Sequence, residues 1–345
     1  MAAALDPVVP GSPLMVVEDL VVHFRLRGRG SASVRAVDGV SLTVDAGRTL
    51  GVIGESGSGK STLGRGMLQL VPATGGRVVF RGVEPAALSG RERRELQARY
   101  QMIFQDPLAS LDPRMKVLNS VTEPLVVHGV LSKADRTARA LELLERVGLT
   151  AAQAQRFPHE LSGGQRQRVN IARALTLQPD LLVCDESVAA LDVALQAEIL
   201  NLFVELQRDL GVSYVFITHD LSVAAHIADR IGVMYLGRLM ELGPADAVVS
   251  APLHPYTEAL LSAQPLPVPR YGQTVDRILL EGDIPSPVDP PSGCRFRTRC
   301  PYARQRCADE VPKWRELTPG HAVACHFSEE LSLRSAADVV PVGVT

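Results

Sequence analysis

The sequence has few aromatic residues and no long apolar run. Aromatic residues make up 4% of its 345 residues, and there is one tryptophan. The longest apolar runs, such as 181–184 and 231–236, are far too short to cross a bilayer. Residues 1–13 contain no Lys or Arg and no apolar core of the kind found in a secretory signal. We therefore expect a soluble, intracellular protein that reaches a membrane only through another chain.

The sequence also lacks a strong net charge. Its 36 basic and 38 acidic residues give a formal charge of −2, which speaks against a nucleic-acid binder that relies on a basic surface. The length allows one large and one small domain, or two of similar size.

Residues 54–61, Gly-Glu-Ser-Gly-Ser-Gly-Lys-Ser, fit the pattern G-x-x-x-x-G-K-[ST]. An apolar segment, 49–53, precedes them and a helical pattern, 62–68, follows, which is the context that a phosphate-binding loop requires. Glycines let the backbone N–H groups turn toward a phosphate, and the helix N-terminus adds partial positive charge. We expect Lys60 to reach the β- and γ-phosphates of a nucleotide and the Ser61 hydroxyl to ligate Mg²⁺. A chance glycine-rich turn is the alternative, and so complete a match disfavours it.

Polar residues follow several other predicted elements. Ser162 and two glycines precede a strong helix, so a second phosphate site is possible there, although this signal is weak alone. Asp185 and Glu186 end an apolar strand, where Asp185 can hold Mg²⁺ and Glu186 can polarise a water, but an ordinary acidic turn would look the same. Gln105 and His219 also end apolar strands, and each alone is compatible with a simple loop residue.

Strand and helix patterns alternate along most of the chain, which predicts an α/β fold with a mostly parallel sheet flanked by helices. After about residue 263 proline dominates and regular periodicity disappears. We expect a flexible N-terminus over 1–13, a main domain over 14–265 with a helical part at about 108–178, a small segment over 266–330, and a tail over 331–345.

The order of these motifs resembles that of the ATP-binding subunits of ABC transporters, over about residues 14–265. The resemblance implies a P-loop NTPase with a RecA-like core, an antiparallel β subdomain and a helical subdomain. It also implies roles for matched positions. The Walker A loop consists of Gly54, Glu55, Ser56, Gly57, Ser58, Gly59, Lys60, Ser61 and Thr62, and the signature includes Ser162, Gly163, Gly164 and Gln165. The expected Mg²⁺ ligands are Ser61, Gln105 and Asp185. Glu186 is the catalytic glutamate, Gln105 is the Q-loop glutamine, His219 is the switch histidine, and Phe24 is the adenine-stacking aromatic.

In this family the signature faces the Walker A loop of a second subunit, so ATP hydrolysis requires a dimer. One departure lies after Glu186. The family usually has Glu-Pro-x-Ser-Ala-Leu-Asp, whereas Ser187 and Ala189 stand here at the proline and serine positions. The change bears on communication between two ATP sites, but Glu186 and His219 are intact and we still expect ATP hydrolysis.

Two further stretches resemble the dipeptide and oligopeptide (or nickel) importer subfamily. They are residues 104–113, an extended Q-loop, and residues 254–261 followed by 282–287, a C-terminal extension. The resemblance implies three kinds of partner: two membrane-spanning permease subunits, a second ATP-binding subunit that is identical or homologous, and an extracytoplasmic peptide-binding protein. No nucleic acid is expected among the partners. The chain is then expected at the cytoplasmic face of the cell membrane, with the helical part contacting the permeases.

Four of the five cysteines, Cys294, Cys300, Cys307 and Cys325, lie in this extension. In a reducing cytoplasm clustered cysteines favour metal over disulfides. The spacing is not the C-x₂-C of common zinc ribbons, and five arginines between 295 and 306 would stabilise a negatively charged cluster. Some members of the subfamily carry a [4Fe–4S] cluster, so we favour that cofactor, with Zn²⁺ or reduced thiols as alternatives. Cys184 is expected in the core.

Other functions remain open at this point. A soluble ABC-type ATPase acting on ribosomes or DNA is one, although such proteins usually have two ATPase units or a long coiled coil, and neither pattern is present. An importer of nickel or another small solute is a second. A cysteine-based sensor that gates the ATPase is a third, and it is compatible with the importer.

Overall fold

The computed structural model describes residues 8–26, 32–189, 191–263 and 278–336. The strands are β1 (Pro13–Arg25), β2 (Ser33–Asp45), β3 (Thr49–Ile53), β4 (Gly75–Phe80), β5 (Tyr100–Ile103), β6 (Leu181–Asp185), β7 (Ser213–Thr218), β8 (Arg230–Tyr235), β9 (Arg238–Pro244), β10 (Arg315–Thr318) and β11 (His321–Val323). The helices are α1 (Lys60–Met67), α2 (Gly90–Gln97), α3 (Val117–Val127), α4 (Lys133–Arg146), α5 (Ala151–Ala154), α6 (Gly163–Leu175), α7 (Val193–Leu210), α8 (Leu221–Ile227), α9 (Ala245–Ser250), α10 (Pro255–Ser262) and α11 (Gln305–Asp309), with short 3₁₀ turns at Pro85–Ala87 and Pro158–Glu160.

The strands form two sheets. A three-stranded antiparallel sheet has the order β2-β1-β4, and an eight-stranded sheet has the order β10-β11-β9-β8-β3-β7-β6-β5. Strands β8, β3, β7, β6 and β5 of the larger sheet are parallel, and β9, β11 and β10 continue it in antiparallel fashion. The predicted α/β fold with a mostly parallel sheet is confirmed for this central part.

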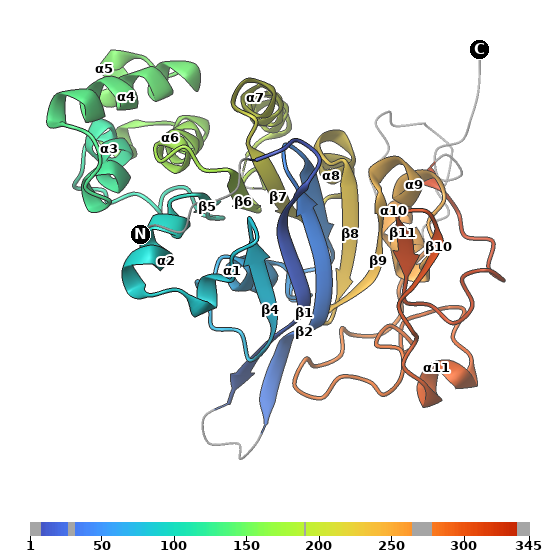
Figure 1. The fold of residues 1–345 in the computed structure, drawn as a ribbon. Helices are drawn as coiled ribbons and strands as arrows, with labels where there is room; N and C mark the ends of the chain where they lie inside the picture. The colour runs from blue at the N-terminus through green and yellow to red at the C-terminus, as the bar shows by residue number, and fades with distance from the viewer. Residues whose placement is uncertain (1–7, 27–31, 190, 264–277, 337–345) are drawn as a thin grey trace, which may run out of the picture.

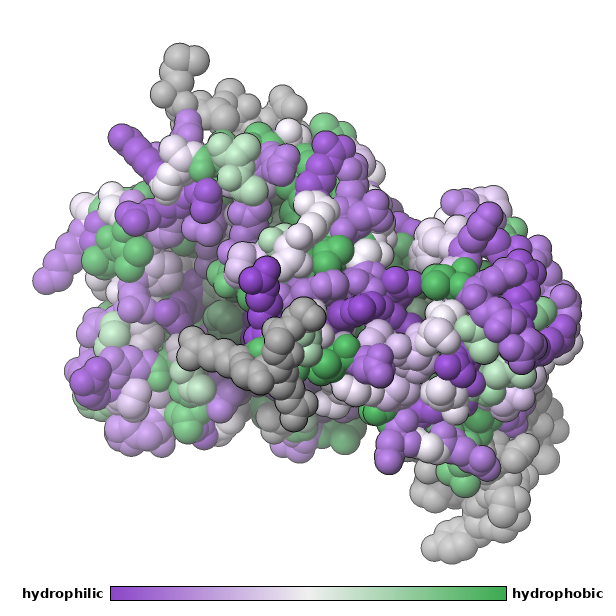
Figure 2. Space-filling model, turned by 90° about the horizontal axis from the view of Figure 1, so that it is seen from below, coloured by the Kyte–Doolittle hydropathy of each residue, from purple (hydrophilic) through white to green (hydrophobic). Residues whose placement is uncertain are grey.

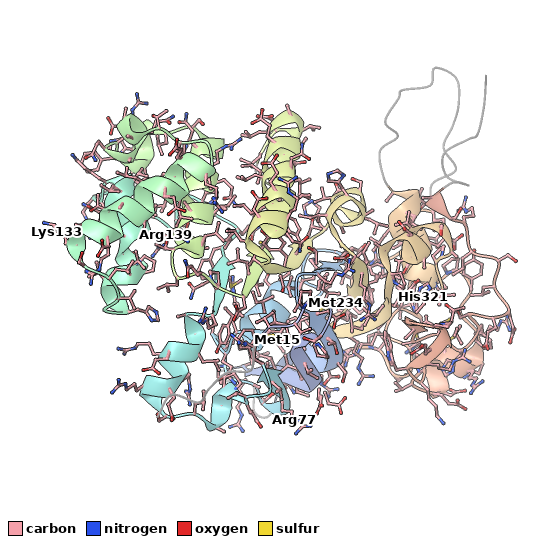
Figure 3. The ribbon with its side chains drawn as sticks, turned by 45° about the horizontal axis from the view of Figure 1, so that its top comes forward. Met15, Arg77, Lys133, Arg139, Met234 and His321 are labelled. Atoms are coloured by element: carbon pink, nitrogen blue, oxygen red, sulfur yellow. The ribbon has the colours of Figure 1, made fainter. Side chains whose placement is uncertain are left out.

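The elements lie in three regions along the larger sheet (Figure 1). Helices α3 to α6 lie beyond the β5 edge, and most of the segment that follows residue 278 lies beyond β9 at the other end. The loop with Pro287 runs back to β2, where its carbonyl oxygen accepts from the Arg35 N–H at 3.0 Å. The three-stranded sheet packs against the centre, where Met15 of β1 and Met234 of β8 are both fully buried (Figure 3). In the same view Lys133 lies in the helical region and His321 in the C-terminal segment.

The central strands are buried on both faces. Every residue of β3, β6 and β7 is buried, which accounts for their continuous apolar runs, because helices or a second sheet cover both faces of such a sheet. Phe203 of α7 packs edge-to-face on Tyr214 and Phe216 of β7, with ring centroids 5.4 and 5.6 Å apart. Among the described residues no helix is long and apolar enough to cross a bilayer, and the face in Figure 2 is mainly hydrophilic with apolar residues in small groups.

Regular structure after residue 278 was missed by the sequence analysis. Helix α11 and strands β10 and β11 have five, four and three residues, which is too short to give a recognisable period. Strand β11 exists because it pairs with β9, through Ala322 with Leu242 and Val323 with Glu241. The expected division at residue 265 falls within 264–277, outside the described residues, as do parts of the predicted N-terminal segment and tail.

An aromatic cluster joins the C-terminal segment to the rest of the chain. Phe296 is fully buried and its ring centroid lies 5.3 Å from that of Tyr235 and 5.2 Å from that of Tyr256. The His254 ring centroid lies 5.7 Å from that of Phe296. This cluster gives the segment part of its hydrophobic core.

Replacing Phe296 should therefore destabilise the whole protein. Truncating a buried aromatic residue costs about 3–5 kcal/mol, so we expect Phe296→Ala to lower the melting temperature clearly. The control is Trp314→Ala, because the Trp314 side chain is 44% exposed and its removal should cost little. Equal melting temperatures for Phe296→Ala and the unmodified protein would contradict the anchoring role.

Candidate functional site

The phosphate loop lies between β3 and α1, as expected from the sequence. Gly54 and Gly59 have φ angles of 154° and 104°, values that residues with a Cβ rarely adopt. A Cβ at Gly54 would lie 2.1 Å from the Met234 carbonyl oxygen, and one at Gly59 would lie 2.0 Å from the Ala36 carbonyl oxygen. Only glycine fits at these two positions, so the loop is held close to the surrounding backbone.

Lys60 begins helix α1 and its side chain turns back over the loop. The ammonium donates to the carbonyl oxygens of Gly54 and Glu55, at 2.7 and 2.9 Å. Burial lowers the pKa of Lys60, and the negative charges of Glu186, Asp185 and Glu55 act in the opposite direction. The cation is therefore placed among carboxylates and loop carbonyls, where an anionic ligand would meet it.

Ser61 and Asp185 lie side by side. The Ser61 hydroxyl donates to Asp185 Oδ1 at 2.6 Å. Asp185 is fully buried, and its Oδ2 has no hydrogen bond, with the Arg65 guanidinium 3.7 Å away. Burial raises the pKa of Asp185, while the Ser61 bond and Arg65 oppose that shift. A hydroxyl beside a carboxylate with an unpaired buried oxygen matches the hard oxygen ligands that Mg²⁺ prefers, so these residues fit the expected ion.

Gln105, Glu186 and His219 meet at the ends of β5, β6 and β7. The Gln105 amide donates to Glu186 Oε2 at 2.6 Å, and His219 Nδ1 lies 3.7 Å from Glu186 Oε1. Glu186 has a φ of 45°, an uncommon conformation for a residue with a side chain. Its N–H donates to the Ile217 carbonyl oxygen at 2.9 Å, so the neighbouring strand holds the backbone of Glu186 in place.

Gln105, Glu186 and part of the phosphate loop border one open cavity of about 410 Å³. Phe24, which is 41% exposed, contributes to its wall together with Val34 and Ala36 of β2. An aromatic and apolar wall beside a phosphate loop is suited to a planar base. The remaining lining residues are Ser56, Gly57, Gly59, Lys60, Ser61, Thr62, Gln105, Glu186 and Pro287.

The signature residues do not line this cavity. Ser162 caps α6: its hydroxyl accepts from the Gln165 N–H at 3.3 Å, and the Gln165 side chain accepts from the Ser162 N–H at 3.0 Å. A Cβ at Gly164 would lie 2.4 Å from Leu195 Cδ2, so the helix begins in close contact with α7. The structure thus brings the Walker A loop together with Gln105, Asp185, Glu186 and His219, but leaves residues 162–165 apart from that cavity.

Three residues at the site were not found from the sequence. Pro287 lines the cavity, Arg299 pairs with Glu55, and the Glu55 N–H donates to the Tyr256 hydroxyl. Tyr256 and Arg299 lie 201 and 244 positions after Glu55 in the sequence. Sequence spacing carries no signal for such contacts, because they depend on how the C-terminal segment folds back.

The four cysteines of the C-terminal segment approach one another. The Cys294 N–H donates to the Cys307 carbonyl oxygen at 2.8 Å, and the pKa of Cys300 responds to the charges of the other three. Burial raises the pKa of Cys294 to about 11 and that of Cys300 to about 12. All five cysteines are free, and Cys184 lies in the core as predicted.

The predicted metal centre at these cysteines is not supported. Within the part of the chain that the structure describes, no group of three or more His, Cys, Asp or Glu residues could hold a metal ion. The Cys-rich metal-binding character expected of the extension is therefore not found in this geometry.

Comparison with known proteins agrees with the site. Residues 37–189 match the family model described as ABC transporter, and residues 240–307 match the model described as oligopeptide/dipeptide transporter, C-terminal region. The oligopeptide transport ATP-binding protein AppF of Bacillus subtilis is 47% identical over 319 residues, which are 91% of this chain and 97% of AppF. The chain belongs to the ABC transporter ATP-binding family. It is an ABC-type ATPase subunit, and ATP with Mg²⁺ agrees with that family.

Further relatives of this ABC ATPase support the assignment. A putative oligopeptide transport ATP-binding protein of Bacillus subtilis, YkfD, is 50% identical over 318 residues, 91% of this chain and 95% of YkfD. A solved dimeric structure of the ATP-binding cassette MJ0796, described as a post-hydrolysis state bound to ADP and Pi, has a TM-score of 0.61 and 29% identity, covering 67% of this chain and 98% of that one. The cbiO1 structure from Clostridium perfringens has a TM-score of 0.61 and 28% identity, and the match covers 69% of this chain and 90% of the cbiO1 chain. The ABC cassette fold is thereby confirmed.

Glu186 is expected to act in the chemical step and not in binding. Removing a general base typically lowers a rate by about 10²–10⁴-fold. We expect Glu186→Gln to lose ATPase turnover by at least 10²-fold while ATP still binds, because Lys60, Ser61 and Asp185 are untouched. Turnover that stays unchanged in Glu186→Gln would reject this role.

Proposed function

We propose that this ABC ATPase binds and hydrolyses ATP to energise the import of dipeptides or oligopeptides through a membrane transporter. The observation that carries this proposal is similarity over 91% of the chain to proteins named for oligopeptide or peptide transport. The C-terminal match at residues 240–307 points the same way. Nickel or another small solute is the second candidate cargo.

We assign the nucleotide site by role. Residues 54–62 would cradle the phosphates, with Lys60 on the β- and γ-phosphates, and Phe24 would stack on the base. Ser61, Gln105 and Asp185 would hold Mg²⁺, which supplies charge neutralisation at the phosphates. Glu186 would take the proton of the attacking water, and Gln105 and His219, which lie at its two carboxylate oxygens, would orient it.

The ATPase is proposed to work as a dimer. Residues 162–165 lie at the start of the 13-residue helix α6, where free N–H groups and the helix dipole favour an anion. Because they do not line the cavity of their own chain, they are available to the nucleotide of a second subunit, identical or homologous. Closing and opening of that interface would then accompany ATP turnover.

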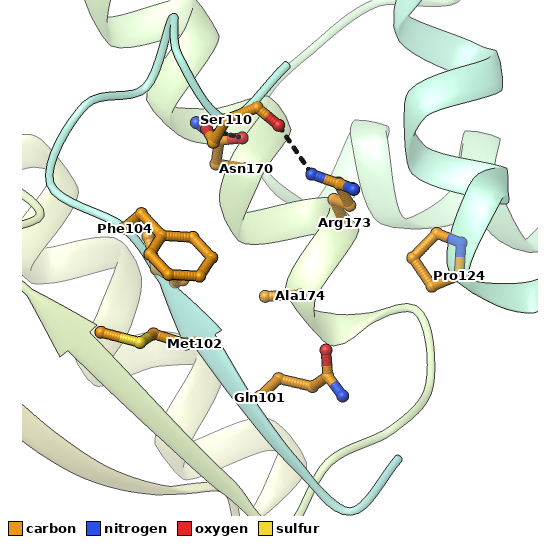
Figure 4. Close-up of a pocket in the computed structure, with 9 residues that line it drawn as sticks. Gln101, Met102, Phe104, Ser110, Pro124, Asn170, Arg173 and Ala174 are labelled. Carbon is orange, nitrogen blue, oxygen red and sulfur yellow. Dashed lines mark hydrogen bonds between the residues drawn. The ribbon is translucent and has the colours of Figure 1, made fainter. Parts of the chain in front are cut away.

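The Q-loop and the helical region are proposed to contact two permease subunits. Between β5 and helices α3 and α6 lies a pocket of about 140 Å³ (Figure 4). Ser110 ties its rim to α6, through Asn170 Oδ1 at 3.0 Å and the Arg173 guanidinium at 2.8 Å. Phe104 and Leu108 of the Q-loop are 43% and 45% exposed. A cytoplasmic segment of a permease seated here would sense the position of Gln105.

The domain organisation is part of the same proposal. We infer an ATP-binding unit over 14–265, with its helical part at about 108–178, an importer extension over 266–330, and terminal segments over 1–13 and 331–345. The chain would lie at the cytoplasmic face of the cell membrane, held by its permeases, and an extracytoplasmic binding protein would deliver the peptide.

Affinity purification from detergent-solubilised membranes tests the importer. We expect two polytopic membrane proteins to co-purify with the chain, together with a second ATP-binding subunit if the dimer is mixed. Ribosomal or DNA-repair proteins without any membrane protein would overturn the transport function and leave only the ATPase. Uptake of labelled peptide compared with nickel in cells lacking the protein would then identify the cargo class.

Metal analysis of the purified protein tests which cofactor, if any, the four cysteines hold. The [4Fe–4S] cluster stays a prediction of the sequence, with Zn²⁺ and reduced thiols as its alternatives. Iron and sulfide in anaerobically purified protein would establish the cluster, and zinc alone would reject it. For metal-free protein we expect alkylation of Cys294 at pH 8 to be at least tenfold slower than in urea, because a raised pKa leaves less thiolate at a given pH.

A further inference from the structure

The C-terminal segment holds the phosphate loop by an ion pair. The Arg299 guanidinium donates twice to the carboxylate of Glu55, at 2.6 and 3.2 Å. The Arg299 side chain is 8% exposed and that of Glu55 is 25% exposed. A two-point pair with so little solvent contact is geometrically specific and is weakly screened.

The backbone of Glu55 is held by the same region. Its N–H donates to the Tyr256 hydroxyl at 2.8 Å. Tyr256 is fully buried, and its ring packs on Tyr235 and on Phe296, which lies three positions before Arg299. Backbone and side chain of one loop residue are thus fixed by α10 and by the segment 294–300 together.

A second arginine of this segment supports the loop from behind. Arg295 is 4% exposed and donates to the Leu236 carbonyl oxygen and to the Asp38 carboxylate. Gly237, which follows Leu236 in the sequence, donates its N–H to the Ser58 carbonyl oxygen at 2.8 Å. The loop is therefore braced at Glu55 directly and at Ser58 through the turn between β8 and β9.

Glu55 poses an electrostatic problem for an anionic ligand. It is a carboxylate inside the proposed phosphate-binding loop, and its own carbonyl oxygen accepts from the Lys60 ammonium at 2.9 Å. If its side chain were unpaired, it would repel phosphates and compete with them for Lys60. Arg299 both neutralises this carboxylate and fixes its direction.

We propose that Arg299 is a positioning residue for nucleotide binding, which keeps the Glu55 carboxylate neutralised and fixed beside the phosphate loop. Loss of Arg299 should then be more harmful than simultaneous loss of both partners, because only the single change leaves an unpaired negative charge in the loop. The inference rests on the nucleotide site proposed above.

The test is the affinity of the full-length chain for a fluorescent ATP analogue, measured without turnover. We expect Arg299→Gln to weaken binding about tenfold, and the double variant Arg299→Gln with Glu55→Gln to recover most of that loss. Arg299→Lys, which keeps the positive charge, should bind more tightly than Arg299→Gln. The matched control is Arg297→Gln, because Arg297 lies in the same segment but donates to Ser292.

The outcomes separate this inference from the proposed site. Lys60→Ala should abolish binding; if it does not, the nucleotide site itself is wrong. If Lys60→Ala abolishes binding but Arg299→Gln binds normally, or the double variant is as weak as Arg299→Gln, the positioning role is overturned. Melting temperatures of all variants show which are folded. If Arg299→Gln is not folded, Arg299→Lys takes its place in the comparison. A loss of affinity in Arg299→Lys that adding Glu55→Gln does not reduce would then overturn the role.

Discussion

Parallel pairing of β5, β6, β7 and β3 is the constraint on which the site depends. The register places Cys184 beside Phe216, and Ile53 beside Thr218. All these strands therefore end at the same edge of the sheet, where ligands of open α/β folds bind. The phosphate loop, Gln105, Glu186 and His219 each follow one of these strands, and Asp185 is the last residue of β6. Four distant parts of the sequence therefore meet at this edge.

Much of this arrangement could be predicted from the sequence. The motif at 54–61 has a local pattern, and the strands before Gln105, Asp185 and His219 are continuous apolar runs. The regularity of a doubly covered parallel sheet makes such runs readable. The parts that could not be predicted have no local pattern. Strand β11 forms only against β9, and the contacts of Glu55 join residues that are more than 200 positions apart.

For the cysteines, the sequence pattern and the folded geometry disagree. Their grouping near the C-terminus was predicted, and their mutual influence in the structure agrees with it. A metal centre also needs thiolates and convergent directions, and within the described residues no group of three or more His, Cys, Asp or Glu residues could hold a metal ion. Spacing along the chain fixes neither of these, because both depend on burial and on the direction of each side chain.

The C-terminal strands also change the border of the sheet. Without them β9 would expose a row of unpaired N–H and C=O groups, which is a template for association with another chain. Strand β11 pairs with β9, and β10 forms the new border with four residues, among them Arg315 and Glu316. A border that is short and charged resists the addition of further strands. The same segment that reaches the phosphate loop thereby protects the protein against aggregation through its sheet.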